Sequence, residues 1–482
     1  YSFDGFATIN GSAGVDWLTT VPGEWTKAAE DYSGSRFDLL DAYVYGYWDL
    51  GEYGDTALEI RAGKQVINWG EGLFFLDGVS NQVPMNWNKL TTVGTELKEA
   101  FIGNNALYAN LGFADGTSVE AYYQFEWNRT EMPPVGTFYG FDILFRGATE
   151  SIASLGGINL LDPDATPSDS GQWGIAFRKP IGDVEYGLYY TRYHQTIAFA
   201  RSTGDIAGQV VVDDPEFGGQ FLATYCLNSL GNPTSALCAE QYWPEEQDLF
   251  GVSFATTWGP FAVAGEVAYR PDRELFTLWT GGSGLFGGPE GSTSSQVADT
   301  LNASVNALWL GGQTILGIDS QFAAFQIGVD YIDGNVDELM PMLAISRADA
   351  DVGNNADLNM AGYADIYGYG PADGLLDPNW LGTPGYIHAD KSAFGAAMSW
   401  TGTWLSAFPA TDVDLDIFLQ HDIKGNSHLY GNFAEGRTLM AASLTATWRQ
   451  AFQAKLGFSG SSLETSDYED QDSIYFAINY KF

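Results

Sequence analysis

Apolar and polar residues alternate at every second position over long stretches of the chain. Residues 472–482 place apolar side chains on one face and polar or small ones on the other. The same alternation recurs in residues 117–128, 412–420 and 452–459. A period of two puts successive side chains on opposite faces of a β-strand. Several of these stretches are longer than the five or six residues of an ordinary strand, which a soluble sandwich explains poorly.

The spacing of the alternating stretches predicts about sixteen strands. Short links at 51–55, 115–116, 182–183, 259–260 and 449–450 alternate with long ones, which is typical of outer-membrane barrels. We therefore expect residues 1–482 to form a single all-β domain, a transmembrane antiparallel β-barrel with long extracellular loops and short periplasmic turns. The expected strands begin near residues 2, 35, 56, 106, 117, 172, 183, 246, 260, 300, 321, 392, 412, 436, 451 and 472.

Composition agrees with a membrane protein of this kind. The 482 residues include 21 Lys or Arg against 61 Asp or Glu, a formal charge of −40, which argues against a nucleic-acid partner. No apolar run approaches the ~18 residues of a spanning helix, so a membrane-embedded form must be a barrel. A chain beginning at Tyr1 fits removal of a signal peptide, or a trimmed chain. The expected location is the outer membrane of a Gram-negative bacterium.

Three motifs resemble a proteobacterial family of outer-membrane proteins of unknown function. They are residues 62–71 (AGKQVINWGE), 120–127 (EAYYQFEW) and 133–138 (PPVGTF), and the likeness extends in order over most of the chain. Lys64 stands where the family pattern has Arg. Members are associated with growth on sterols, sphingoid bases and hydrocarbons. The resemblance implies a channel for hydrophobic compounds, similar in role to long-chain fatty-acid transporters.

Strand parity assigns side chains to the two faces of the predicted wall. The carboxy-terminal strand ends on an aromatic residue and resembles the assembly signal of outer-membrane barrels, which implies the barrel-assembly machinery as a partner. Its lipid-facing residues, expected to contact membrane lipid and lipopolysaccharide, are Phe476, Ile478, Tyr480 and Phe482. The polar side chains expected to face the lumen are Arg61, Glu120, Gln124, Glu126, Asp414, Asp416 and Lys455.

One long connection, residues 71–104, is too apolar for a solvated loop, and it is expected to fold inward or to cap the barrel. With the next long loop it supplies the expected substrate-binding gate, made of Leu73, Phe74, Phe75, Leu76, Met85, Trp87, Phe138 and Phe141. The predicted function is passive uptake of lipid-, sterol- or alkane-like molecules, with a periplasmic carrier protein as a possible partner. The alternative is a general or selective porin for small polar solutes. A lipid-modifying enzyme is disfavoured, because none of the four histidines has a serine two residues on, so no catalytic residue is predicted.

Two cysteines and an acidic loop complete the candidate chemistry. Cys226 and Cys238 lie in one polar loop and predict a disulfide formed in an oxidising compartment, the alternative being two unrelated thiols. No cofactor is expected. Structural Ca²⁺ would use carboxylates such as Asp349, Asp351 and Asp357, although a solvated acidic surface is the favoured interpretation of that loop.

Overall fold

A computed structural model describes most of the chain between residues 38 and 480. The described ranges are 38–51, 55–80, 82–90, 100–132, 166–202, 205–214, 219–227, 239–276, 279–280, 283–284, 295–313, 317–334, 336, 389–429, 432–462 and 472–480. Within them, no helix has the length and apolar character needed to cross a membrane.

The described residues contain one sheet of fifteen strands in which every neighbouring pair is antiparallel. In spatial order these strands are β1 (Ala42–Leu50), β2 (Thr56–Gln65), β3 (Asn104–Phe113), β4 (Ser118–Gln124), β5 (Trp173–Ile181), β6 (Val184–Tyr193), β11 (Gln247–Trp258), β12 (Phe261–Phe276), β15 (Ser295–Gly311), β16 (Ser320–Asp333), β17 (Ser392–Phe408), β18 (Thr411–Lys424), β19 (Thr438–Trp448), β20 (Phe452–Ser462) and β21 (Ser473–Tyr480). Smaller elements lie within the long connections: α2 (Trp87–Leu90), β7 (Phe199–Ser202), β8 (Asp205–Asp214), β9 (Gly219–Leu227), β10 (Ala239–Tyr242), β13 (Trp279–Thr280) and β14 (Ser283–Gly284).

The predicted fold class is confirmed. Each strand start expected from residue 35 onward has its strand in the sheet, and short connections alternate with long ones along the whole order. The strand expected near residue 2 lies outside the described residues. The tight turns use local backbone chemistry: Pro409-Ala410 joins β17 to β18 with Ala410 at φ 58°, and Arg449-Gln450-Ala451 joins β19 to β20 with Arg449 and Gln450 at positive φ.

The two faces of the sheet differ as the alternation predicts. The outer face exposes large apolar side chains, for example Val44 at 74% and Val305 at 50%. The inner face carries buried polar and charged side chains from most strands. A continuous apolar outer face with a polar inner one is the surface of a membrane-spanning barrel. The alternation ends with β4, so Trp127, which the pattern places outward, is instead buried with its ring 4.7 Å from that of Trp243.

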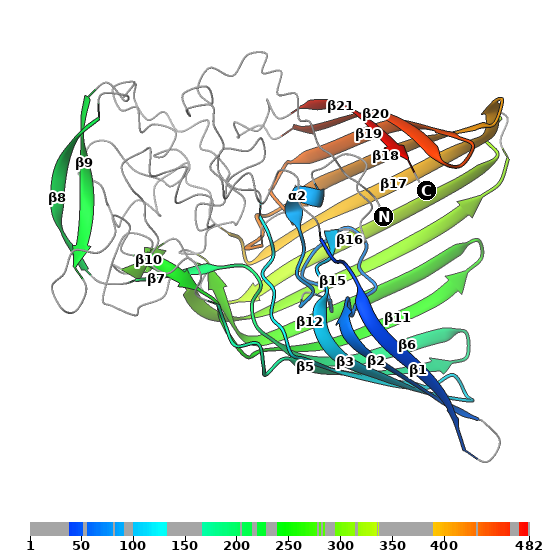
Figure 1. The fold of residues 1–482 in the computed structure, drawn as a ribbon, viewed down its shortest axis with the longest axis horizontal. Coiled ribbons are helices and arrows are strands. Elements are labelled where there is room, and N and C mark those ends of the chain that lie inside the picture. The colour runs from blue at the N-terminus through cyan, green and yellow to red at the C-terminus, as the bar shows by residue number, and fades with distance from the viewer. Residues whose placement is uncertain are drawn as a thin grey trace.

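The sheet is strongly curved around the segment that follows β2 (Figure 1). Trp69 contacts Glu120 on β4, and Phe74 contacts Phe418 on β18. These two strands are eight steps apart in the sheet, so a flat sheet would separate them by about 38 Å. Five residues of chain reach at most about 17 Å, so the wall bends around the segment.

Candidate functional site

The chain leaves β2 at Gln65 and continues along the polar inner face rather than over the outside of the sheet. We call residues 66–86 the inner segment. Apart from a bridge at its end, its described residues, 66–80 and 82–86, form no strand or helix. Its buried polar backbone groups therefore need partners elsewhere. Many of those partners are side chains of the surrounding wall.

Trp69 anchors the start of the inner segment. Its indole Nε1 donates to Glu120 Oε2 at 2.7 Å, and its carbonyl accepts from Arg178 Nη2 at 3.1 Å. Its ring lies 5.0 Å from that of Tyr122 and 6.1 Å from that of Tyr189. Trp69 is only 2% exposed, so the anchor combines apolar burial with a charge-assisted hydrogen bond.

Backbone amides of the inner segment converge on two wall side chains. Glu266 accepts from the N–H groups of Glu71 (2.5 Å) and Val79 (3.2 Å). Gln326 Oε1 accepts from three successive N–H groups, those of Leu73, Phe74 and Phe75, at 3.1, 2.6 and 3.4 Å. Asn306 Nδ2 donates back to the carbonyl of Glu71 at 2.5 Å. The wall thus replaces the hydrogen bonds that a helix or strand would have made internally.

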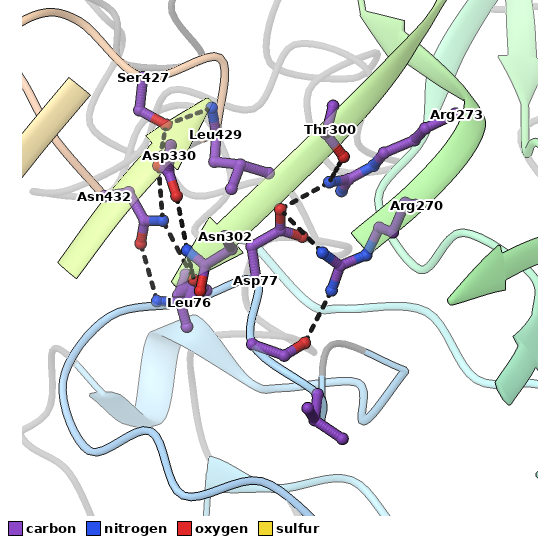
Figure 2. A network of polar contacts seen from close by, with 12 residues as sticks. Leu76, Asp77, Arg270, Arg273, Thr300, Asn302, Asp330, Ser427, Leu429 and Asn432 are labelled. Atoms are coloured by element: carbon purple, nitrogen blue, oxygen red, sulfur yellow. Dashed lines mark hydrogen bonds and ion pairs between the residues drawn. The ribbon is translucent and has the colours of Figure 1, made fainter. Parts of the chain in front are cut away.

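A buried ionic and polar network fixes the far part of the inner segment (Figure 2). Asp77 Oδ2 lies 2.6 Å from Arg273 Nη1 and 3.3 Å from Arg270 Nη1, and all three side chains are at most 2% exposed. Arg270 Nη2 also donates to the carbonyl of Gly78 at 2.7 Å. Asp77 has a positive φ of 72°, which asparagine and aspartate tolerate better than most residues. One carboxylate therefore joins the segment to two arginines of β12.

The same network reaches the loop between β18 and β19. Asn432 Nδ2 donates to the carbonyl of Leu76 at 3.1 Å, and Asn432 Oδ1 accepts from the Leu76 amide at 2.8 Å. Asp330 accepts from Asn302 Nδ2 (2.6 Å), Ser427 Oγ (2.6 Å) and Asn432 Nδ2 (3.0 Å). The inner segment, the wall and this external connection are therefore joined through hydrogen bonds of short side chains.

Electrostatics favour the bound position of the segment. Burial alone would raise the pKa of the Asp77 carboxyl, but the guanidinium groups of Arg270 and Arg273 outweigh it and lower the pKa. Burial raises the pKa of Glu71. His428, buried beside the network, has its pKa lowered to about 3, mainly by burial and by the charge of Arg273. His428 is therefore neutral at neutral pH.

The predicted gate residues of the inner segment separate into two groups. Phe75 is 8% exposed and packs on Phe433, with ring centroids 4.7 Å apart, so it holds the segment to the wall. Leu73, Phe74 and Leu76 stay partly exposed, and Phe74 lies edge-on to Phe418 at 5.6 Å. Phe75 is thus buried in the packing against the wall and Phe74 packs in part against the same cluster, whereas Leu73 and Leu76 stay partly exposed.

The other predicted gate residues lie elsewhere. Met85 bridges to Phe101, and the Trp87 amide donates to the Glu131 carbonyl at 2.8 Å, so both belong to a layer near the ends of β3 and β4. Phe138 and Phe141 lie outside the described residues.

The polar residues predicted to face the lumen lie on the inner face wherever they belong to a strand. Glu120 and Gln124 are buried there, and Arg61 lies 4.0 Å over the ring of Tyr108. Asp414 and Asp416 accept from Thr403 and Thr401 at 2.6 and 2.8 Å, and Lys455 is half-buried on β20. Glu126 lies beyond the end of β4, where it accepts from the Asn105 amide at 3.0 Å.

Further predicted residues are placed only in part. Phe476, Ile478 and Tyr480 are 65, 56 and 58% exposed on one face of β21, whereas Phe482 lies outside the described residues. Cys226 lies in β9, whose side chains are not described, and Cys238 lies outside the described residues, so the disulfide stays a prediction. The calcium candidates Asp349, Asp351 and Asp357 also lie outside them.

The histidines of the described residues serve local structure. His194 is 1% exposed; its Nε2 lies 2.9 Å from the carbonyl of Ser170, and its Nδ1 accepts from the Glu246 amide at 3.0 Å. His421 Nδ1 lies 2.9 Å from Thr438 Oγ1. His388 lies outside the described residues.

Sequence reasoning missed the residues that hold the inner segment. Inward positions of strands with a two-residue apolar period are occupied by Glu266, Asn302 and Gln326. This period alone could have indicated that the three side chains face the lumen. Nothing near them in sequence shows that residues about 190 to 250 positions away supply their partners.

The fold and the inner segment define a membrane-spanning β-barrel with a segment of chain bound to its inner face. The family model described as "Protein of unknown function (DUF1302)" matches residues 4–482, so the chain belongs to the DUF1302 family. No curated protein matches the chain.

Several solved outer-membrane proteins are similar to this chain at low scores. A loop L8 deletion mutant of OmpT, an outer membrane protein of Vibrio cholerae, has a TM-score of 0.32 and 9% identity, covering 91% of this chain and 89% of that one. OmpF of Salmonella typhi in complex with daunomycin has a TM-score of 0.32 and 9% identity, and the match covers 91% of this chain and 95% of OmpF. The outer membrane channel DcaP of Acinetobacter baumannii has a TM-score of 0.27 and 9% identity, and the match covers 90% of this chain and 99% of DcaP. At these scores the likeness adds nothing to what the strand order shows.

Proposed function

We propose that this chain is a passive channel of the bacterial outer membrane that takes up hydrophobic small molecules, lipid-, sterol- or alkane-like, with no enzymatic step. The membrane location is supported by the apolar outer face, because a β-barrel with alternating lipid and lumen residues is the architecture of that membrane. A channel is supported by the polar inner face and by a segment that narrows the lumen without a domain of its own.

One observation carries the choice of a hydrophobic substrate. Leu73, Phe74 and Leu76 of the inner segment are partly exposed, and Phe74 lies edge-on to the partly exposed ring of Phe418 on β18. Exposed apolar side chains of this kind do not suit a water-filled polar pore, because apolar constrictions exclude water and ions. Burial of one such side chain contributes about 1.5–3 kcal/mol, so a few contacts give micromolar capture of an apolar solute.

The test compares uptake with conductance. The double variant Leu73→Ser/Phe74→Ser should take up less of a hydrophobic compound into proteoliposomes and conduct more ions in planar bilayers. Val305→Ser, a change on the outer face of β15 where the side chain is 50% exposed, serves as the matched control and should alter neither. Unchanged uptake in the double variant would overturn the hydrophobic assignment.

A polar diffusion porin is the second candidate. It is favoured by the ladder of Asp414 and Asp416 with Thr403 and Thr401 on the inner face of β17 and β18. A large, steady conductance in the unaltered protein, with no uptake of hydrophobic compounds, would select this candidate instead.

A further inference from the structure

Three tyrosines stand in a row on β1. Tyr43, Tyr45 and Tyr47 alternate along the strand, and their ring centroids are 6.3 and 5.6 Å apart. They are 40, 65 and 66% exposed. At about 3.4 Å per residue, the row is about 14 Å long. We call these three residues the tyrosine row.

Strand register places the tyrosine row on the inner face. Tyr45 is paired with Arg61, and Arg61 is paired with Tyr108. Tyr108 is buried, and its hydroxyl donates to Glu120 at 2.8 Å, which is the carboxylate that also anchors Trp69. Side chains directly opposite one another across strands share a face, so the row shares the face of the inner segment. It therefore differs from an interfacial aromatic belt, which faces lipid.

Polar groups border the row and are already paired with one another. The Tyr47 hydroxyl donates to Glu59 Oε1 at 3.1 Å, and Arg61 Nε lies 3.3 Å from the same oxygen. The Arg61 guanidinium also lies 5.8 Å from the ring centroid of Tyr43. Because the two charges balance, the surface selects neither an anion nor a cation. It offers flat aromatic faces with hydrogen-bonding groups along one edge.

We propose that the tyrosine row is a binding track for neutral, flat ring compounds that carry a hydroxyl or carbonyl group. A ring can stack on one tyrosine and pass to the next, since stacked or tilted ring pairs are favourable at centroid distances of about 4.5–7 Å. A flexible acyl chain gains less, because it presents no flat face. This inference rests on the proposed channel function and narrows its substrate class to ring systems.

The test uses naphthol as the ring probe and decanol as an open-chain probe of the same carbon number. Binding to the folded protein in detergent is measured by saturation-transfer NMR, and interruption of single-channel current is measured in planar bilayers. The variant Tyr43→Leu/Tyr45→Leu/Tyr47→Leu keeps apolar bulk but removes the rings. Trp48→Leu changes an outward aromatic of the same strand, 49% exposed, and is the matched control. Tyr45→Leu alone serves if the triple variant does not assemble.

We expect naphthol to bind the unaltered protein and the control equally, and the triple variant about tenfold more weakly. Decanol should bind all three alike. If naphthol binds the triple variant as tightly as the unaltered protein, or binds the unaltered protein no better than decanol does, the tyrosine row is not a binding track for rings. Naphthol binding that depends on the row in a protein with no conductance and no uptake would keep the site and reject the channel. Conductance and uptake in a protein whose naphthol binding does not depend on the row would keep the channel and reject the site.

Discussion

Replacing Asp77 with Asn tests whether the inner segment is held by its buried ion pairs. The substitution keeps size and shape but removes the charge that faces Arg270 and Arg273, which are 0 and 2% exposed. Arginine does not lose its proton in proteins, so both cations would remain buried without a carboxylate partner from the segment. Removing one partner of a buried ion pair typically costs about 3–5 kcal/mol.

The cost should appear in the attachment of the segment rather than in the whole barrel, because the hydrogen bonds between strands are unaffected. A loss of 3 kcal/mol raises the open population about a hundredfold. Amide hydrogen exchange of Val79 and of Leu73–Phe75, whose N–H groups donate to Glu266 and Gln326, should accelerate by a similar factor. Ion conductance should rise in parallel.

Asp115→Asn is the matched control. Asp115 pairs with Lys179 at 3.2 Å on a turn where the two side chains are 60 and 44% exposed, so its loss should leave the attachment of the inner segment unchanged. The reasoning is refuted if Asp77→Asn leaves exchange and conductance at the level of this control.

Three further outcomes are expected. Between pH 6.5 and about 4, the connection between β18 and β19 should lose about 1.4 kcal/mol of stability per pH unit relative to the variant His428→Phe, because the unfolded chain binds a proton that the buried imidazole does not; hydrogen exchange of the two proteins measures this difference, and His421→Gln should behave like the unaltered protein. Gly78→Ala should raise conductance, since its Cβ would fall on the carboxylate of Glu266 and displace it from the segment; conductance equal to that of the unaltered protein would contradict this. Deleting Phe482 should lower the amount of assembled barrel, measured by its heat-dependent mobility in gels, and unchanged amounts would reject the assembly signal.

The strands could be predicted because their cause is local. A two-residue period fixes which side chains share a face, and turn residues fix where each strand ends. The constriction could not be predicted in the same way. Gln326 alternates like any inward polar residue, yet its oxygen receives amides from about 250 positions earlier. Such contacts depend on how the wall curves, which no short stretch of sequence encodes.

The tyrosine row shows a second limit. The stretch Tyr43-Val-Tyr-Gly-Tyr47 alternates visibly, but the intervening positions continue to Trp48 and Leu50, so both faces are apolar enough to meet lipid. Only the pairing of Tyr45 with Arg61 tells the two faces apart. Where both faces of a strand resemble each other, register must come from the neighbouring strand.

The polar inner face is a weaker argument for a polar substrate than its composition implies. The side-chain oxygens of Glu266 and Gln326 already accept hydrogen bonds from amides of the inner segment, and Asn302 donates to the carbonyl of Leu76 at 3.3 Å. Buried polar groups that are already paired offer a passing solute little hydrogen bonding. What stays partly exposed at the constriction includes Leu73, Phe74 and Leu76. The polar wall thus holds the segment, and the partly exposed apolar side chains of the segment are what the proposed hydrophobic solute would contact.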